Sequence, residues 1–132
     1  MKNKSFARPQ LDSGQSLVEF ALTLPLLILV IMGVFDLGWG IYAKNTIADA
    51  AREGARAGII TTNTDSVIRT RVRNAAQGLN LTNAQIVISP SPTRTHGGTI
   101  QVTINYTYQP LTSFIVGGVS VPLSSRATMV VE

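Results

Sequence analysis

The sequence predicts an α+β chain, with one long apolar N-terminal helix and a small domain of one helix packed on a three- to four-stranded antiparallel sheet. Three observations predict this class. An uncharged apolar run covers residues 20–35, small residues then recur at helical spacing, and residues 100–109 alternate strictly between apolar and polar. We expect three parts: a basic leader (1–14), the N-terminal helix (15–60) and the α+β domain (61–132).

The apolar run is long enough to indicate a membrane-spanning helix. From Phe20 to Phe35 it contains no charge, and Glu19 and Asp36 bound it. These 16 residues extend about 24 Å as a helix, somewhat less than a hydrocarbon core of about 30 Å. Apolar residues on both sides extend the predicted span to about residues 17–42. A helix buried in a soluble core is the alternative.

The placement of charge predicts the topology of this span. Lys2, Lys4 and Arg8 all precede the apolar run, which favours a cytoplasmic N-terminus and an export-side C-terminal domain. A cleaved secretory signal would share the basic start and apolar middle. Asp36-Leu-Gly-Trp-Gly stands where such a signal would have a small-residue cleavage site, so we expect the segment to be retained.

Beyond the span, the helical pattern continues with small residues. One face carries Ala43, Ile47, Ala50, Ala51, Gly54 and Gly58. Gly54 and Gly58 form a small-xxx-small pair, which permits close approach of another backbone. Each glycine weakens a helix by about 1 kcal/mol relative to alanine, which favours a packing role. The partner of this face is the chain's own domain, a neighbouring subunit, or both.

A second helix is predicted from Thr64 or Asp65 to about Gln77, with Gly78 as its C-terminal stop. Its expected buried face is Ile68, Val72, Ala75 and Leu79. The helix also carries Arg69, Arg71 and Arg73, but only the first and third share a side and no aromatic residues lie between them. We interpret these arginines as a solvated face and expect no nucleic-acid partner.

The remaining sequence predicts strands. A short β-branched run covers residues 86–88, and the strict alternation of residues 100–109 indicates a strand with one buried and one solvated face. Val119, Val121 and Leu123 suggest a further strand. Residues 127–131 continue it after an expected bulge near Ser124 and Ser125.

The composition gives little support to catalysis or metal binding. The chain has no cysteine, and its one histidine, His96, lies beside two glycines away from clustered carboxylates. No histidine–carboxylate set accompanies the serines and threonines, and no glycine-rich phosphate loop is present. We expect no enzyme activity, no cofactor and no metal.

The most informative constellation is Gly14-Gln15-Ser16-Leu17-Val18-Glu19-Phe20. A carboxylate at the start of an apolar span is costly unless it is paired or held at the interface. If the chain is cut after Gly14, Glu19 becomes the fifth residue and could pair with the new amine of an adjacent subunit, which would fix the helix register. Alternatively, Glu19 marks the headgroup boundary, where the helix dipole favours an anion.

These features resemble the TadE-like pseudopilins, which are minor pilins of the Tad (tight adherence, Flp) pilus within the type IV filament superfamily. Four of them carry the resemblance. They are the Gly14 to Glu19-Phe20 processing pattern, the run Glu-Phe-Ala-Leu-Thr-Leu-Pro-Leu-Leu at 19–27, Asp36-Leu-Gly, and Ala-Ala-Arg-Glu-Gly-Ala-Arg-Ala at 50–57. They cover about residues 14–58; the β-rich remainder is less diagnostic.

The resemblance implies a maturation and assembly route. A prepilin peptidase would cut between Gly14 and Gln15, and Glu19 with Phe20 would act in later assembly. The implied partners are other pseudopilins, the major Flp-type pilin, the inner-membrane assembly platform and the lipid bilayer. The implied location is the cytoplasmic (inner) membrane, with incorporation into an extracellular adhesive pilus, and the implied role is pilus initiation, assembly or regulation.

Two alternatives stay open. Pro25 removes one helical hydrogen bond, which either lets the helix adapt between bilayer and filament or is a tolerated kink. The whole chain could also be an uncleaved, signal-anchored single-pass protein with an extracytoplasmic binding domain. That hypothesis leaves the joint placement of Gly14, Glu19 and the small-residue face unexplained.

Overall fold

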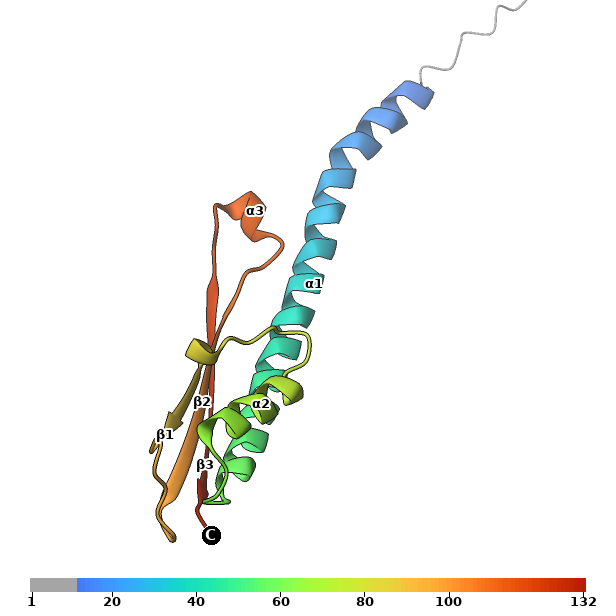
Figure 1. Ribbon diagram of the computed structural model, residues 1–132. Helices are drawn as coiled ribbons and strands as arrows, with labels where there is room; N and C mark the ends of the chain where they lie inside the picture. The colour runs from blue at the N-terminus through green and yellow to red at the C-terminus, as the bar shows by residue number, and fades with distance from the viewer. Residues whose placement is uncertain (1–11) are drawn as a thin grey trace, which may run out of the picture.

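The computed structural model describes residues 12–132, and the basic residues of the predicted leader lie outside this range. It confirms the α+β class, with a long helix followed by a small domain of a helix and a three-stranded antiparallel sheet (Figure 1). The elements are α1 (Asp12–Gly58), α2 (Asp65–Ala75), the 3₁₀ turn η1 (Asn83–Gln85), β1 (Ile86–Ser89), β2 (Thr99–Tyr108), α3 (Ser113–Val116) and β3 (Val121–Val130).

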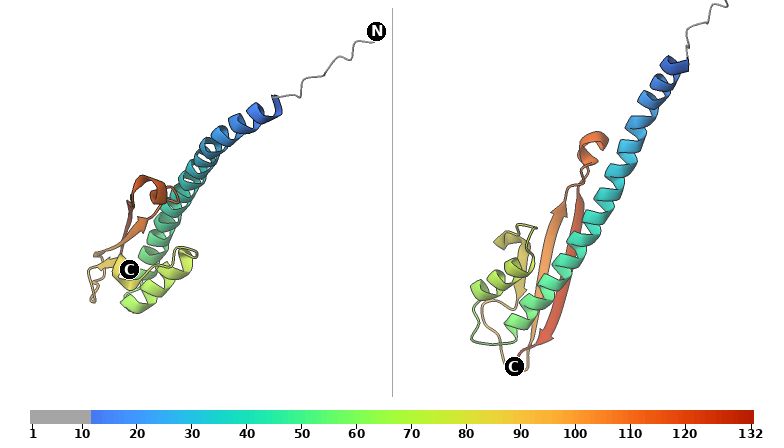
Figure 2. Two further views of the ribbon diagram at one scale, coloured as in Figure 1. Left: turned by 90° about the horizontal axis from the view of Figure 1, so that it is seen from above. Right: turned by 90° about the vertical axis from the view of Figure 1, so that its right-hand side faces the viewer.

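Helix α1 has two halves with different surroundings. Its N-terminal half extends away from the domain, whereas its C-terminal half lies along the sheet and beside α2 (Figures 1 and 2). Burial changes along the same line, since every residue from Gly14 to Ile31 is exposed and Ala43, Ile47 and Ala50 are fully buried. One continuous helix therefore joins a free apolar rod to a packed core.

The core lies between the C-terminal half of α1, α2 and one face of the sheet. Apart from Ile47, the buried side chains of α1 are small and allow this close packing, and the other large side chains come from the opposing elements. The residues that are buried in it include Ala43, Ile47, Ala50, Ala51, Ala55, Ile68, Val72, Ile86, Ile88, Ile100, Val102 and Ile104. The small-residue face thus packs on the chain's own domain, which was one of the two partners that the sequence allowed.

Helix α2 is amphipathic, as its sequence pattern predicts, but it ends earlier. It covers Asp65–Ala75, and the chain turns through Gly78 with a φ of 93°. The predicted inward residue Ala75 is exposed, and Ala76 is buried in its place. Ile68, Val72 and Leu79 are buried as predicted, so Ala75 is the one residue that the helical pattern placed on the wrong face.

The sheet has the order β1-β2-β3, and both pairs are antiparallel. The pairing of β2 with β3 is unbroken from Thr99↔Val130 to Tyr108↔Val121, so the bulge expected near Ser124 and Ser125 is wrong. Ser125 keeps the inward phase of Leu123 and Ala127 and lies opposite Ile104. Because Ser125 is polar although it faces inward, the sequence at this point resembles a break in the alternation of apolar and polar residues.

A buried ion pair connects the β1–β2 connection to the start of α2. The guanidinium of Arg94 donates to the Asp65 carboxylate and to the backbone oxygen of Asn63, and Arg94 is only 7% exposed. A buried arginine requires such partners because an unpaired buried charge costs several kcal/mol (about 3–5 when one partner is removed). This pair fixes the domain end that lies far from the free half of α1 (Figure 1).

Candidate functional site: the free helix and the Asp36 junction

The predicted processing site lies in the first turns of α1. Gly14 and Gln15 are exposed, and a Cβ atom placed on Gly14 would have no neighbour within 4 Å. No other element of the described chain covers this segment. The peptide bond between these two residues is therefore sterically open to another protein.

Glu19 and Phe20 follow one turn later, and both are exposed. The Thr23 hydroxyl donates to the backbone oxygen of Glu19 at 2.7 Å, a bond that belongs to the helix itself. Within residues 12–132, the Glu19 carboxylate has no ion pair and no hydrogen bond. A carboxylate on an apolar helix needs either a charged partner or a polar interface. This geometry is compatible with both interpretations of Glu19, pairing with an adjacent subunit and a position at the headgroup boundary.

The free half of α1 presents a continuous apolar surface. Its large hydrophobic side chains between Leu17 and Phe35 are all exposed except Met32, which is half-buried. The helix is long and apolar enough to cross a membrane. None of the most apolar stretch is buried within the fold. A core helix of a soluble domain is thereby excluded as its explanation.

Pro25 lies inside this free half and does not end the helix. Proline removes one backbone donor and clashes with the preceding turn, so the helix bends where a proline is tolerated. The helix axis curves toward its N-terminal end (Figure 1). The structure therefore keeps Pro25 inside one continuous helix, in the half that the domain does not cover.

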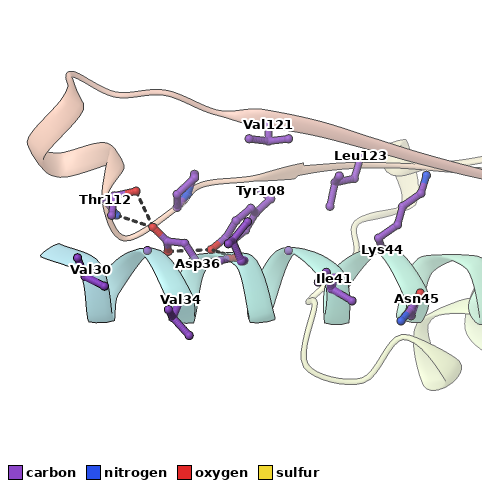
Figure 3. Close-up of a pocket in the computed structure, with 14 residues that line it drawn as sticks. Val30, Val34, Asp36, Ile41, Lys44, Asn45, Tyr108, Thr112, Val121 and Leu123 are labelled. Carbon is purple, nitrogen blue, oxygen red and sulfur yellow. Dashed lines mark hydrogen bonds between the residues drawn. The ribbon is translucent and has the colours of Figure 1, made fainter. Parts of the chain in front are cut away.

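Asp36 marks the point where the free rod meets the domain. Its carboxylate accepts four hydrogen bonds from the end of β2 and the following loop. Figure 3 shows those from Tyr108 and Thr112. The Tyr108 hydroxyl donates to Oδ1 at 3.0 Å, and the Leu111 backbone N–H donates to the same oxygen at 2.6 Å. The Thr112 backbone N–H and hydroxyl donate to Oδ2 at 2.9 and 2.6 Å.

The chemistry of this junction is suited to holding a negative charge near an apolar surface. Both carboxylate oxygens are satisfied, and Asp36 itself is 8% exposed. Burial, followed by the hydrogen bond to Asp36 and the charge of that residue, raises the pKa of Tyr108 to about 12. The phenol therefore keeps its proton and remains a donor over the whole physiological range.

An apolar groove of about 730 Å³ runs beside the junction, between α1 and the β2–β3 hairpin (Figure 3). Val30 and Val34 line it from the helix, and Pro110, Val121 and Leu123 line it from the hairpin. The groove brings residues of the predicted membrane span together with residues about 80 to 90 positions later in the chain. The domain thus reaches past Asp36 toward the free half of α1.

Gly54 and Gly58 lie at the other end of the packed half. A Cβ atom on Gly54 would come within 2.4 Å of Val72 Cγ2, and one on Gly58 within 2.1 Å of Ile100 Cδ1. Both glycines therefore permit close approach of α2 and β2 to α1. They are far along the chain from Gly14, Glu19 and Pro25, so the predicted site residues form two groups on one helix.

The interaction of Asp36 with Tyr108 and Thr112 is not predicted by the sequence. Asp36-Leu-Gly was noted as a motif, but the sequence carries no sign of partners 72 and 76 positions later. One signal was available, because an aspartate inside an apolar helix requires donors. Within the described part of the chain, no group of three His, Cys, Asp or Glu side chains is placed to hold a metal ion.

The fold and these residues define a class of protein: a small α+β domain carried on a long, exposed, apolar N-terminal helix. Residues 14–56 match a protein-family model described as "TadE-like protein", which confirms the resemblance drawn from the sequence motifs. The match covers most of α1 and includes Gly14, Glu19, Asp36 and Gly54, while the sheet lies outside it. No curated protein and no solved structure gave a significant match.

Proposed function

We propose that the chain is a minor pilin (pseudopilin) of a Tad/Flp-type pilus, which takes part in pilus initiation, assembly or regulation for adhesion. One observation carries the proposal: the apolar surface that the fold leaves uncovered lies on the same helix as the TadE-like match. A protein that keeps such a surface needs a bilayer or other helices around it. A pilin is surrounded by the bilayer before assembly and by the helices of other subunits in the pilus.

In this proposal the chain is made as a precursor. Residues 1–14 are a cytoplasmic leader, α1 crosses the cytoplasmic membrane over about residues 17–42, and the α+β domain lies on the export side. A prepilin peptidase cuts between Gly14 and Gln15, which are exposed as a protease requires. The domain lies well away from this bond and does not obstruct it (Figure 1).

Assembly then uses the new N-terminus. Glu19 becomes the fifth residue of the mature chain, and its carboxylate has no partner within the described structure. It pairs with the α-amino group of Gln15 in an adjacent subunit, because an ion pair between apolar helices compensates two charges at once. The neighbours are other pseudopilins and the major Flp-type pilin at the membrane assembly platform.

The first test is the N-terminus of the protein recovered from membranes of a host that carries the cognate peptidase. We expect intact mass and N-terminal sequencing to give a mature chain that begins at Gln15. Gly14→Leu should accumulate as full-length precursor. Gly33→Leu is the matched control, since Gly33 also has no neighbour within 4 Å, and it should be processed normally.

Two other outcomes contradict the proposal in different ways. A wild-type chain that still begins at Met1 indicates the uncleaved, signal-anchored module. A cut beyond Phe35 indicates that the apolar segment is only a signal peptide.

The assembly step has its own test. Glu19→Ala should leave the cut after Gly14 unchanged but reduce both pilus formation and co-purification with other pilins. Wild-type piliation of this variant would assign Glu19 to the headgroup boundary and remove the pairing from the proposal.

A further inference from the structure

The β2–β3 connection carries a cluster of apolar side chains that the fold does not cover. Phe114 is 93% exposed, and Leu111, Ile115 and Val119 are all more than half exposed. No Asp, Glu, Lys or Arg occurs between Gly97 and Ser125. We call residues 110–119 the hairpin tip. Such a cluster on a small domain marks a surface that contacts something apolar.

The position of the tip indicates what that contact is. Asp36 holds the base of the tip through the backbone N–H groups of Leu111 and Thr112. From there α3 projects along α1 toward its N-terminal half, and the views in Figures 1 and 2 agree on this direction. Thr112 lines the same groove as Val30 and Gly33, which precede Asp36. The tip therefore lies beside the apolar run and not beside the polar part of α1.

The membrane boundary can be located on α1 independently. Nineteen residues from Leu17 to Phe35 cover about 28 Å, close to the thickness of a hydrocarbon core. Trp39 and Tyr42 follow, with ring centroids 5.3 Å apart, and such aromatic residues favour the interface. A boundary between Phe35 and Tyr42 places the tip at the depth of the headgroups and the first part of the acyl chains.

The backbone of the tip is prepared for this environment. Polar backbone groups need internal partners where water is scarce. Asp36 accepts the N–H groups of Leu111 and Thr112, and within the tip Ser113 N–H donates to Pro110 and Ile115 N–H donates to Thr112. The Gly118 N–H donates to Ser113 at 2.7 Å. These bonds remove much of the cost of placing an irregular loop in the interface.

We propose that the hairpin tip inserts into the leaflet of the bilayer on the domain's side, as a second lipid contact beside the spanning helix. This inference rests on the membrane span of the proposed function. Phe114, Ile115 and Leu111 enter the headgroup and acyl boundary, while Asp36 stays bound to the base of the tip. The domain is thereby held against the membrane surface at two points, the helix and the tip.

Depth-dependent fluorescence quenching in reconstituted vesicles tests the insertion. The full chain has a single tryptophan, Trp39, so Trp39→Phe gives a background in which one introduced tryptophan reports alone. Phe114→Trp is the test variant, and its near-complete exposure means that the substitution does not disturb packing. In phosphatidylcholine brominated near the headgroup end of the acyl chains, we expect it to lose roughly half or more of its fluorescence, since interfacial elements lie about 5–10 Å into this boundary.

Two further variants make the result decisive. Val130→Trp is the matched control, because Val130 is an exposed apolar residue at the opposite end of β3. Its fluorescence should not change in brominated lipid. Leu27→Trp reports on the span itself and should be quenched by lipid brominated near the middle of the bilayer.

The pattern across the variants separates the two ideas. Quenching of Leu27→Trp without quenching of Phe114→Trp overturns the insertion of the tip and leaves the span intact. No quenching of Leu27→Trp overturns the span, and the insertion with it. A third outcome also overturns the insertion. If the emission of Phe114→Trp is not quenched but is blue-shifted, and the blue shift increases with protein concentration, another protein chain covers the tip.

Discussion

At the scale of single residues, Asp36 determines how the domain is attached to its helix. One carboxylate gathers a phenol, two backbone N–H groups and a hydroxyl from a segment more than 70 positions away. Hydrogen bonds to a charged group contribute more than neutral ones, typically about 1.5–3 kcal/mol each to remove. Loss of this side chain would therefore leave four donors at the junction without their acceptor.

We predict that Asp36→Ala lowers the free energy of unfolding of the domain by about 2–4 kcal/mol, because four donors lose their acceptor at once. Chemical unfolding of the full chain in detergent measures this loss. Hydrogen exchange should locate it, with faster exchange of the Leu111 and Thr112 amides and little change in the centre of β2.

Asp49→Ala is the matched control for this prediction. Asp49 lies on the same helix and pairs with Arg52 at 2.8 Å, but both side chains are about 70% exposed. A solvent-exposed pair one helical turn apart contributes only about 0.3–0.5 kcal/mol. Equal losses for the two substitutions would show that Asp36 has no special role in the attachment.

At the scale of elements, α1 combines two designs in one helix. The N-terminal half has large apolar side chains that point outward in all directions, whereas the C-terminal half has a narrow face of alanine and glycine that packs on α2 and β2. The change from large to small residues therefore coincides with the point where α1 begins to pack on α2 and β2. The same helix passes from a half that the fold leaves uncovered to a half that packs closely in the protein core.

We predict that Gly54→Ala destabilises the domain by about 1–3 kcal/mol, although alanine favours helix by about 1 kcal/mol. The new Cβ would lie 2.4 Å from Val72 Cγ2 and 3.2 Å from Val102 Cγ1. Val72 is β-branched in a helix, so its side chain has little freedom to move away. Urea unfolding of the full chain in detergent gives the difference.

Gly38→Ala is the control at this scale. Gly38 lies in the same helix, and a Cβ there would meet no atom within 4 Å. Stability should stay the same or rise slightly because alanine is the better helix former. A Gly54→Ala variant as stable as Gly38→Ala would contradict close packing of α1 on its own domain.

The sequence predicted the elements better than it predicted their contacts. Strict alternation predicted β2 closely, because each side of a half-buried strand has one kind of neighbour. Ser125 led to the false bulge, since one polar residue facing inward looks like a change of phase. The short helix α3 was not predicted at all, because four residues are too few to show a period.

The candidate site divides in the same way. Gly14, Gln15, Glu19 and Phe20 lie next to one another, so a local motif was enough to propose them. The junction at Asp36 depends on hydrogen bonds between residues more than 70 positions apart, and the sequence around Tyr108 and Thr112 contains no motif that predicts them. The choice between the chain's own domain and a neighbour for the face of Gly54 also required the fold.

At the scale of the whole molecule, the proposed topology places the two ends of the chain on opposite sides of a membrane. The absence of cysteine makes this directly measurable with single introduced thiols. Thr128 lies on the outward face of β3 and is exposed. We predict that an impermeant maleimide labels Thr128→Cys in intact spheroplasts.

Ser5→Cys is the complementary variant, expressed without the peptidase so that the leader is retained. It should be labelled only after the membrane is disrupted. Labelling of Ser5→Cys in intact spheroplasts, with protection of Thr128→Cys, would indicate the inverted orientation.

The absence of any linker between the rod and the core has a mechanical consequence. In the proposed pilus, tension on the subunit would enter the domain along the axis of α1, which forms one side of the packed core. Neighbouring side chains from Ala43 to Ala57 would then resist by shear along the whole interface, instead of yielding one after another as an edge strand does when it is peeled. The packed half of α1 would therefore not separate from the α+β domain unless the domain itself unfolded.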